Sequence, residues 1–199
     1  MLGIRIAWQT SIFWPVRRIE LKVSGADRTA RFEQTFLPHL DAAYNLARWL
    51  ARNDQDAEEV VQEAYLRAFE AYESFRGQAA KAWLLAIVRN TSFSRLRRAM
   101  TAGEAAEFDE EIHSPPAAAS DPESLALAEA NSRLLTAALG ALPEEYREAI
   151  VMRELEEMSY KEIAAVTKVP IGTVMSRLAR ARERLRESIG SAGAKEVER

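Results

Sequence analysis

The sequence contains no cysteine and only two histidines, His39 and His113. The lack of cysteine excludes disulfide bonds and thiolate metal sites, and it fits a reducing compartment such as the cytoplasm. The two histidines lie far apart in the sequence, and no glycine-rich loop of the kind that holds phosphate is present. We therefore expect no catalytic residues, no metal ion and no other cofactor, and we predict that the protein is not an enzyme.

Long apolar runs and an excess of positive charge are also missing. Arg5 interrupts the first apolar stretch and no small-residue cleavage pattern follows it, which argues against a membrane-spanning helix and against a secretory signal. We expect residues 1–28 to form a flexible extension. The formal net charge is −3, so any contact with nucleic acid must be local rather than spread over the whole surface.

Glycine and proline are scarce, with 8 and 7 residues among 199, and no alternating strand pattern occurs. Apolar residues recur at helical spacing over residues 29–100 and again over 125–189. The stretch between them, 101–124, is rich in alanine, proline and acidic residues. We predict an all-α fold of two small helical domains joined by this flexible linker and followed by a frayed tail at 190–199.

Residues 142–186 predict a helix-turn-helix. Ser159 and Glu162 have the spacing of a capping box, which begins a helix at Tyr160. Pro170 lies in the break that follows. The second helix carries an apolar stripe: Val174, Leu178, Ala181, Leu185 and Ile189. An arginine-rich face is left for phosphates and base edges, which indicates a DNA-binding domain, whereas a merely solvated basic surface is the alternative.

Two further helices are predicted in the first domain. Asn53 can cap a helix whose apolar residues form one buried stripe: Ala57, Val60, Val61, Ala64 and Ala68. A loop marked by Gly77 then leads into a helix from Lys81 to Arg98, and the last turns of this helix are strongly basic. These arginines either offset the helix dipole or, together with Trp83, form a surface suited to unstacked bases of single-stranded DNA.

Together, these motifs resemble the extracytoplasmic-function (ECF) sigma factors of the sigma-70 family over about residues 30–189. DAEEVVQEAYLRAFE (56–70) resembles the polymerase-binding helix of that family. FRG followed by KAWLLAIVRN (75–90) resembles the segment that melts and reads the −10 promoter element. LPEEYR, SYKEIA and PIGTVMSRLARAR (within 142–182) resemble the domain that reads the −35 element.

The resemblance implies three sets of functional residues. One set would dock on the clamp helices of the largest subunit of core RNA polymerase: Asp56, Glu59, Gln62 and Glu63. A second would contact the melted −10 element: Arg76, Lys81, Trp83, Arg89, Asn90, Arg95, Arg97 and Arg98. A third would enter the major groove at −35: Thr173, Met175, Ser176, Arg177, Arg180, Arg182 and Arg184. In the third set we expect base contacts from Arg177 or Arg180 and phosphate contacts from Arg182 and Arg184.

The implied function is that of an alternative sigma factor, which binds core RNA polymerase and directs it to promoter DNA for transcription initiation. The implied partners also include the β flap of the polymerase and an anti-sigma factor, and no membrane insertion is expected. Met175 stands where many relatives carry arginine or lysine, so readout there is expected to be apolar or absent. The alternative function is a stand-alone helix-turn-helix regulator, which would need no polymerase-binding surface on the 56–70 helix.

The linker is unusually acidic. Its acidic residues are Glu104, Glu107, Asp109, Glu110, Glu111 and Asp121. The resemblance implies that these residues lie along the RNA exit path, where their negative charge would imitate RNA. The alternative interpretation is that the linker is a solvated spacer.

Overall fold

The computed structural model describes residues 26–51, 53–103 and 122–197, and within these ranges it contains helices and no strand. The all-α prediction is confirmed. The expected extension at 1–28 lies almost wholly outside the described residues, as do the linker acids.

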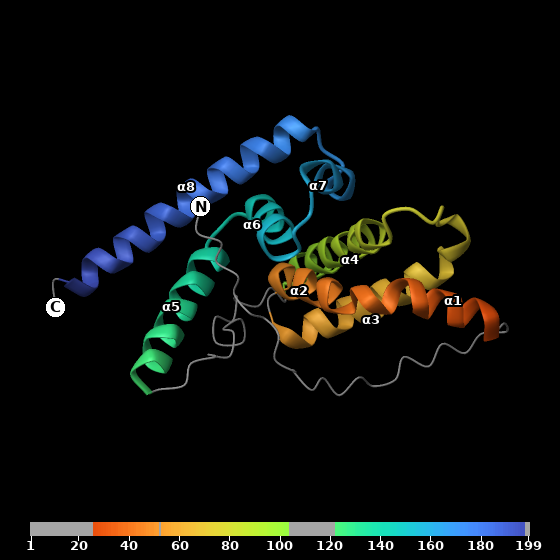
Figure 1. Ribbon diagram of the computed structural model, residues 1–199, viewed down its shortest axis with the longest axis horizontal. Coiled ribbons are helices and arrows are strands. Elements are labelled where there is room, and N and C mark those ends of the chain that lie inside the picture. The colour runs from red at the N-terminus through yellow and green to blue at the C-terminus, as the bar shows by residue number, and fades with distance from the viewer. Residues whose placement is uncertain (1–25, 52, 104–121, 198–199) are drawn as a thin grey trace.

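The first group of helices packs around an aromatic and aliphatic core. Figure 1 shows the arrangement of its helices. It comprises α1 (Ala26–Phe36), α2 (Leu40–Leu50), α3 (Asp54–Glu70) and α4 (Ala80–Ala102), with short 3-10 turns η1 (Leu37–His39) and η2 (Tyr72–Ser74). The Asn53 side chain accepts a hydrogen bond from the backbone N–H of Asp56, so the predicted cap of α3 is confirmed. All five residues of its predicted stripe are buried. The phenol of Tyr65 donates to the carbonyl of Phe36 at 2.8 Å, which satisfies the hydroxyl inside this core.

The second group contains the predicted helix-turn-helix. It comprises α5 (Pro122–Gly140), α6 (Glu144–Ile150), a π-helical turn η3 (Val151–Leu155), α7 (Tyr160–Thr167) and α8 (Ile171–Val197). The capping box of Ser159 and Glu162 is present and α7 begins at Tyr160, as predicted. Of the predicted α8 stripe, Val174, Leu178 and Ala181 are buried.

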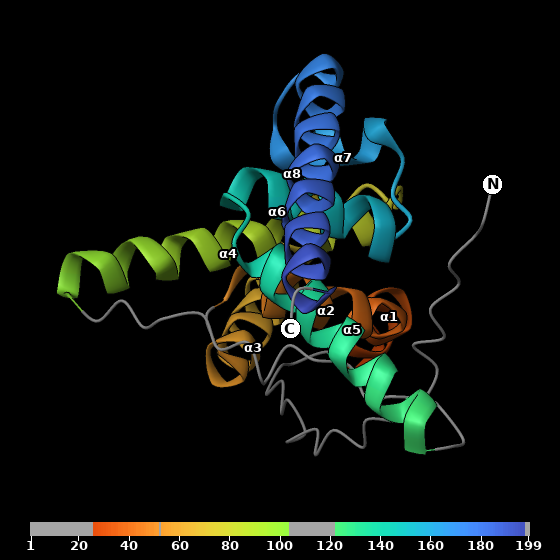
Figure 2. The same cartoon turned by 90° about the vertical axis from the view of Figure 1, so that its left-hand side faces the viewer.

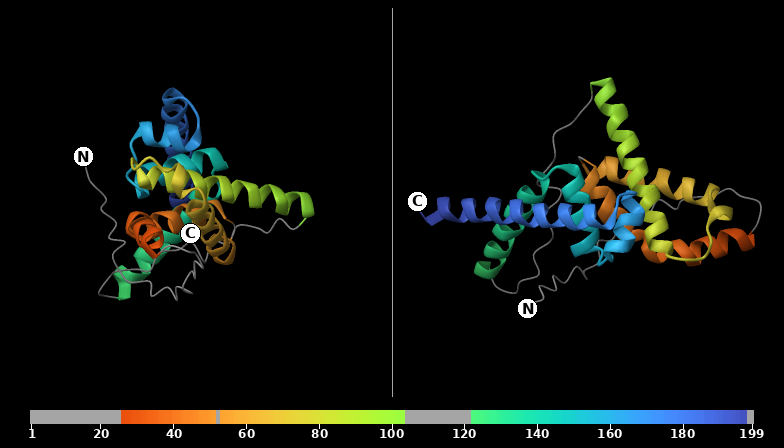
Figure 3. Two further views of the ribbon diagram at one scale, coloured as in Figure 1. Left: turned by 90° about the vertical axis from the view of Figure 1, so that its right-hand side faces the viewer. Right: turned by 90° about the horizontal axis from the view of Figure 1, so that it is seen from above.

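The predicted stripe was wrong at its last member, Ile189, which is 38% exposed. Helix α8 projects beyond the bundle toward its C-terminal end (Figure 1). The helix also continues to Val197, through most of the tail expected to be frayed. In the first group, the C-terminal half of α4 also projects from the bundle, in a different direction from α8 (Figures 2 and 3).

The two groups of helices pack directly against each other. Helix α4 contacts α7, while α2 contacts α6 and η3. The buried residues of both groups consequently form one continuous core rather than two separate ones. Several of the candidate functional residues described below lie at this interface.

Candidate nucleic-acid interface

The loop before α4 carries Arg76, which is exposed and has no ion-pair partner among the described residues. Two residues of this loop adopt left-handed backbone conformations, Gly77 (φ 77°) and Ala79 (φ 50°). Glycine adopts this conformation freely, whereas for alanine it costs about 1–2 kcal/mol. The strained turn presents Arg76 to solvent.

Trp83 packs against Phe75, at the start of this loop, and against Phe36 of α1. Its ring centroid lies 5.3 Å from that of Phe75 and 5.2 Å from that of Phe36. The indole is half-buried against these two rings, so its packing contributes to the core of the first group. We infer that it fixes the loop in place and is not a free stacking platform.

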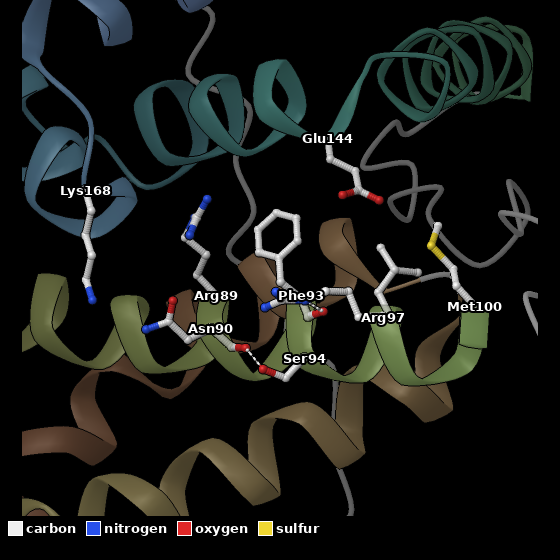
Figure 4. Close-up of a pocket in the computed structure, with 9 residues that line it drawn as sticks. Arg89, Asn90, Phe93, Ser94, Arg97, Met100, Glu144 and Lys168 are labelled. Atoms are coloured by element: carbon white, nitrogen blue, oxygen red, sulfur yellow. Dashed lines mark hydrogen bonds between the residues drawn. The ribbon is translucent and has the colours of Figure 1, made fainter. Parts of the chain in front are cut away.

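Beside the contact of α4 with α7, a cleft of about 660 Å³ lies between residues 89–100 of α4 and the second group of helices. Arg89, Asn90, Phe93 and Arg97 of α4 line this cleft together with Lys168, which follows α7. Figure 4 shows Arg89 and Phe93 pointing from α4 toward the second group of helices, while Lys168 reaches toward α4 at one end of the cleft. Phe93 is the aromatic side chain of this cleft, and the Arg89 guanidinium lies 4.6 Å from its ring centroid. Sequence reasoning did not select Phe93, although its spacing of four from Arg89 places both on one face of a helix.

Glu148 of α6 is fully buried and binds two arginines at once. Its carboxylate accepts hydrogen bonds from Arg89 Nε at 2.6 Å and Arg89 Nη2 at 3.2 Å. It accepts a third from Arg177 Nη1 at 3.2 Å. Burial raises the pKa of Glu148, and this shift is opposed by the hydrogen bond and charge of Arg89 and by the charge of Arg177. One carboxylate thus joins a predicted −10 residue to a predicted −35 residue.

Glu156 makes a second contact between the groups. Its carboxylate lies 2.8 Å from the Lys81 ammonium, and its backbone carbonyl accepts a hydrogen bond from the same ammonium at 2.8 Å. The Asn45 side-chain amide donates a hydrogen bond to the carboxylate of Glu156 at 3.1 Å. Glu156 is 7% exposed, so this contact is shielded from solvent and, like that of Glu148, holds α4 against the second group.

The acidic face of α3 contacts the basic end of α4. Arg95 reaches Asp56 at 3.5 Å and Glu63 at 3.7 Å, and it donates a hydrogen bond to Glu59. Three predicted polymerase-binding acids are therefore paired with a predicted −10 residue. Gln62 is exposed on the same helix.

On α8, the candidate −35 residues fall into two classes. Some cations have partners within the chain: Arg177 binds Glu148, Arg182 lies 2.7 Å from Glu154, and the Arg184 guanidinium lies 5.2 Å from the ring centroid of Tyr146. Other residues are open. Met175, Ser176 and Arg180 are exposed, and Thr173 is half-buried. Arg180 has no ion-pair partner among the described residues.

Two family descriptions match this chain. Residues 35–101 match Sigma-70 region 2, and residues 132–185 match Sigma-70, region 4. The ECF RNA polymerase sigma-E factor of Escherichia coli K12 is 42% identical over 135 residues, which are 64% of this chain and 71% of that protein. The ECF RNA polymerase sigma factor SigE of Mycolicibacterium smegmatis is 36% identical over 152 residues, covering 75% and 58% of the two chains.

The chain belongs to the ECF sigma factors. It is an alternative sigma factor, whose function is promoter recognition in transcription initiation. Its fold is shared with the sigma factor RpoE in a co-crystal with the anti-sigma factor NepR from Bartonella quintana, with a TM-score of 0.67, 31% identity, and coverage of 80% of this chain and 97% of that one. CnrH in complex with the cytosolic domain of CnrY gives a TM-score of 0.58 at 26% identity, with coverage of 82% and 90%.

These matches define the contact between the two groups of helices as one between region 2 and region 4 of the sigma factor. Lys81 and Arg89 lie in the region 2 match, whereas Glu148, Glu156 and Arg177 lie in the region 4 match. Sequence reasoning missed both glutamates, because each bonds a side chain far away in sequence: 59 residues for Arg89 and 75 for Lys81.

No cluster of three or more potential metal-ligating side chains is found in the part of the chain that the structure describes. In that same part, none of the helices has the length and apolar character needed to cross a membrane.

Proposed function

We propose that this sigma factor binds core RNA polymerase through the exposed face of α3, and that it carries no catalytic activity of its own. The single observation that supports this most strongly is the presence of region 2 and region 4 in one chain. The docking residues would be Asp56, Glu59, Gln62 and Glu63. All three acids of this set contact Arg95, so docking would require them to leave Arg95 and contact the polymerase instead.

The exposed side of α4 and the loop before it would contact the −10 element. Arg76 is exposed in the strained loop, and Asn90 and Arg97 line the cleft beside Phe93. Cations beside an aromatic ring suit an unstacked base and its phosphate. Lys81, Arg89 and Arg95 would join this surface after leaving their acidic partners, Arg98 would extend it along α4, and Trp83 would support the loop.

Helix α8 would enter the major groove at the −35 element with its N-terminal residues. Thr173, Met175, Ser176 and Arg180 are the residues available for base edges. Arg182 and Arg184 lie further along the helix and would contact phosphate. Arg177 is held by Glu148, and we propose that it holds α8 against α6 unless that contact opens.

The packed arrangement of region 2 on region 4 cannot bind both promoter elements at once. The elements are 25 base pairs apart by position, which is about 85 Å along a duplex with a rise of 3.4 Å per base pair. Helices α4 and α7 are in direct contact. We infer that the interface opens when the promoter complex forms and that opening separates Arg89 from Glu148.

The proposed partners are core RNA polymerase, including its clamp helices and β flap, promoter DNA and an anti-sigma factor. The last is supported by the two structural neighbours, both of which were solved with an anti-sigma factor or a cytosolic domain of a partner. The proposed place of action is the cytoplasm, where RNA polymerase transcribes.

Run-off transcription on genomic fragments tests the function. We expect discrete start sites only when this chain and core polymerase are both present. Discrete initiation by core polymerase alone, or tight sequence-specific binding of duplex DNA by this chain without core polymerase, would contradict the proposal and favour a stand-alone regulator.

A further inference from the structure

The first turns of α8 present an uncharged surface to solvent. The exposed residues between the start of the helix and Arg180 share an apolar or small character: Ile171, Gly172, Met175, Ser176 and Ala179. Ile171 is 46% exposed and Met175 is 54% exposed. Their spacing of four places them side by side on the helix.

Polar readout from this surface is restricted. The hydroxyl of Ser176 donates to the carbonyl of Thr173 at 2.9 Å, so its proton is already used within the helix. Arg177, the first cation of α8, donates to the buried Glu148. The tip of the helix therefore offers apolar surface where forked donors such as arginine, asparagine or glutamine would be needed to read guanine or adenine.

Only one base presents an apolar group in the major groove. Thymine carries a C5-methyl group there, whereas the other base edges present hydrogen-bond donors and acceptors. The apolar pair is also flanked by exposed cations, Lys168 before it and Arg180 after it. Two cations that flank an apolar patch can contact the two phosphate backbones that border a DNA groove. They would have no such partner on an apolar protein surface.

We propose that Met175, with Ile171 beside it, reads the C5-methyl group of a thymine within the −35 element. This inference rests on the proposed role of α8 as the major-groove helix. It makes Met175 a specificity-determining residue and assigns Arg180 a separate contact. Replacing Met175 does not disturb the core, because the buried neighbours Val174 and Leu178 hold α8 against the rest of region 4.

The test replaces each −35 thymine by deoxyuridine, one at a time on either strand, in promoters recovered by run-off transcription. This change removes a single methyl group and leaves every hydrogen-bonding atom in place. Binding is measured with holoenzyme that contains wild-type sigma factor, Met175→Ala or Arg180→Ala. Far-UV circular dichroism checks that each variant is folded.

At one or two positions, deoxyuridine should weaken binding by the wild type about four-fold, as expected for one buried methyl group. Met175→Ala should bind thymine and deoxyuridine promoters equally at those positions. Arg180→Ala should bind more weakly overall but keep the four-fold difference. This matched variant separates loss of methyl readout from loss of −35 binding.

Two results would overturn the inference: equal binding of all deoxyuridine promoters by the wild type, or an unchanged deoxyuridine effect in Met175→Ala. A third result would also overturn it: if Met175→Ala left promoter binding by the holoenzyme unchanged but weakened the affinity for core polymerase, Ile171 and Met175 would be assigned to a protein contact. Failure of the proposed function is distinguishable, because the holoenzyme would then show no discrete initiation on any promoter.

Discussion

Glu148 is the residue on which region 2 and region 4 of this sigma factor converge. We predict that Glu148→Gln lowers the free energy of unfolding by about 3 kcal/mol, because Arg89 and Arg177 then lose their shared counter-charge in a largely buried site. Urea denaturation of the free protein measures this effect. Glu144→Gln is the matched control, since Glu144 lies one turn earlier on α6 and has no ion pair among the described residues. It should change stability by no more than about 0.5 kcal/mol. Equal losses in the two variants would show that Glu148 has no special structural role.

Single residues that act locally could be predicted from the sequence, whereas those that act across the interface could not. The caps formed by Asn53 and Ser159 follow from side chains three residues apart, and both are present. Glu148 and Glu156 looked like ordinary glutamates of a surface helix. Their importance depends on which helix lies opposite, which no periodicity within α6 or η3 can reveal.

At the scale of the helix, the capping box of α7 gives a prediction with a defined dependence on pH. The Ser159 hydroxyl and backbone N–H bind the carboxylate of Glu162 and lower its pKa. Because the folded-state pKa is the lower one, this stabilisation is present above the ordinary pKa of 4.5 and is lost as the pH falls through the folded-state value. Ser159→Ala should cost about 1 kcal/mol at pH 7.

The measurement is urea denaturation of the wild type, Ser159→Ala and Glu162→Gln at pH 7 and at pH 3. The stability difference between the wild type and Glu162→Gln should shrink at the lower pH, because the wild-type carboxyl group is then protonated. A difference that grows toward pH 3 would contradict the proposed origin of the shift.

The pairing of α3 with α4 gives a second prediction for a pair of elements. If α3 docks on core polymerase, its acids must first leave Arg95, so Arg95→Ala should strengthen core binding several-fold at low salt. The pairs are partly exposed, and stability should fall by no more than about 1 kcal/mol. Arg97→Ala is the control, because Arg97 is exposed on α4 and has no ion pair among the described residues. Weaker core binding by Arg95→Ala, measured by pull-down or fluorescence titration, would show that the pairing prepares the docking surface.

The helical character of the chain and the positions of α3, α4, α7 and α8 could be predicted, whereas α1, α2, α5 and α6 were not separated from one another and the packing of the helices was not predicted. The apolar stripe of α3 and the turn between α7 and α8 follow from local spacing. Helix α8 continues to Val197 beyond its apolar stripe, and Ile189 lies exposed there. The contact of α4 with α7 joins two groups whose patterns are separated by the linker. The apolar pattern of neither group indicates that part of its surface is buried against the other group.

At the scale of the whole molecule, promoter binding and the packed arrangement of region 2 on region 4 should exclude each other. The absence of cysteine allows two fluorescent labels to be placed without a background reaction. We choose Glu70→Cys on α3 and Glu183→Cys on α8, both exposed. Energy transfer between the labels should be high in the free protein and should fall when core polymerase and promoter DNA are added, because the two elements lie about 85 Å apart.

Glu148→Gln should lower the transfer in the free protein before any partner is added. A control pair within region 2, Leu37→Cys with Glu70→Cys, should show no change under any of these conditions. If the transfer between α3 and α8 stays high in complexes that initiate transcription, the interface persists in the active state, and Arg89 and Arg177 must then act on Glu148 rather than on DNA.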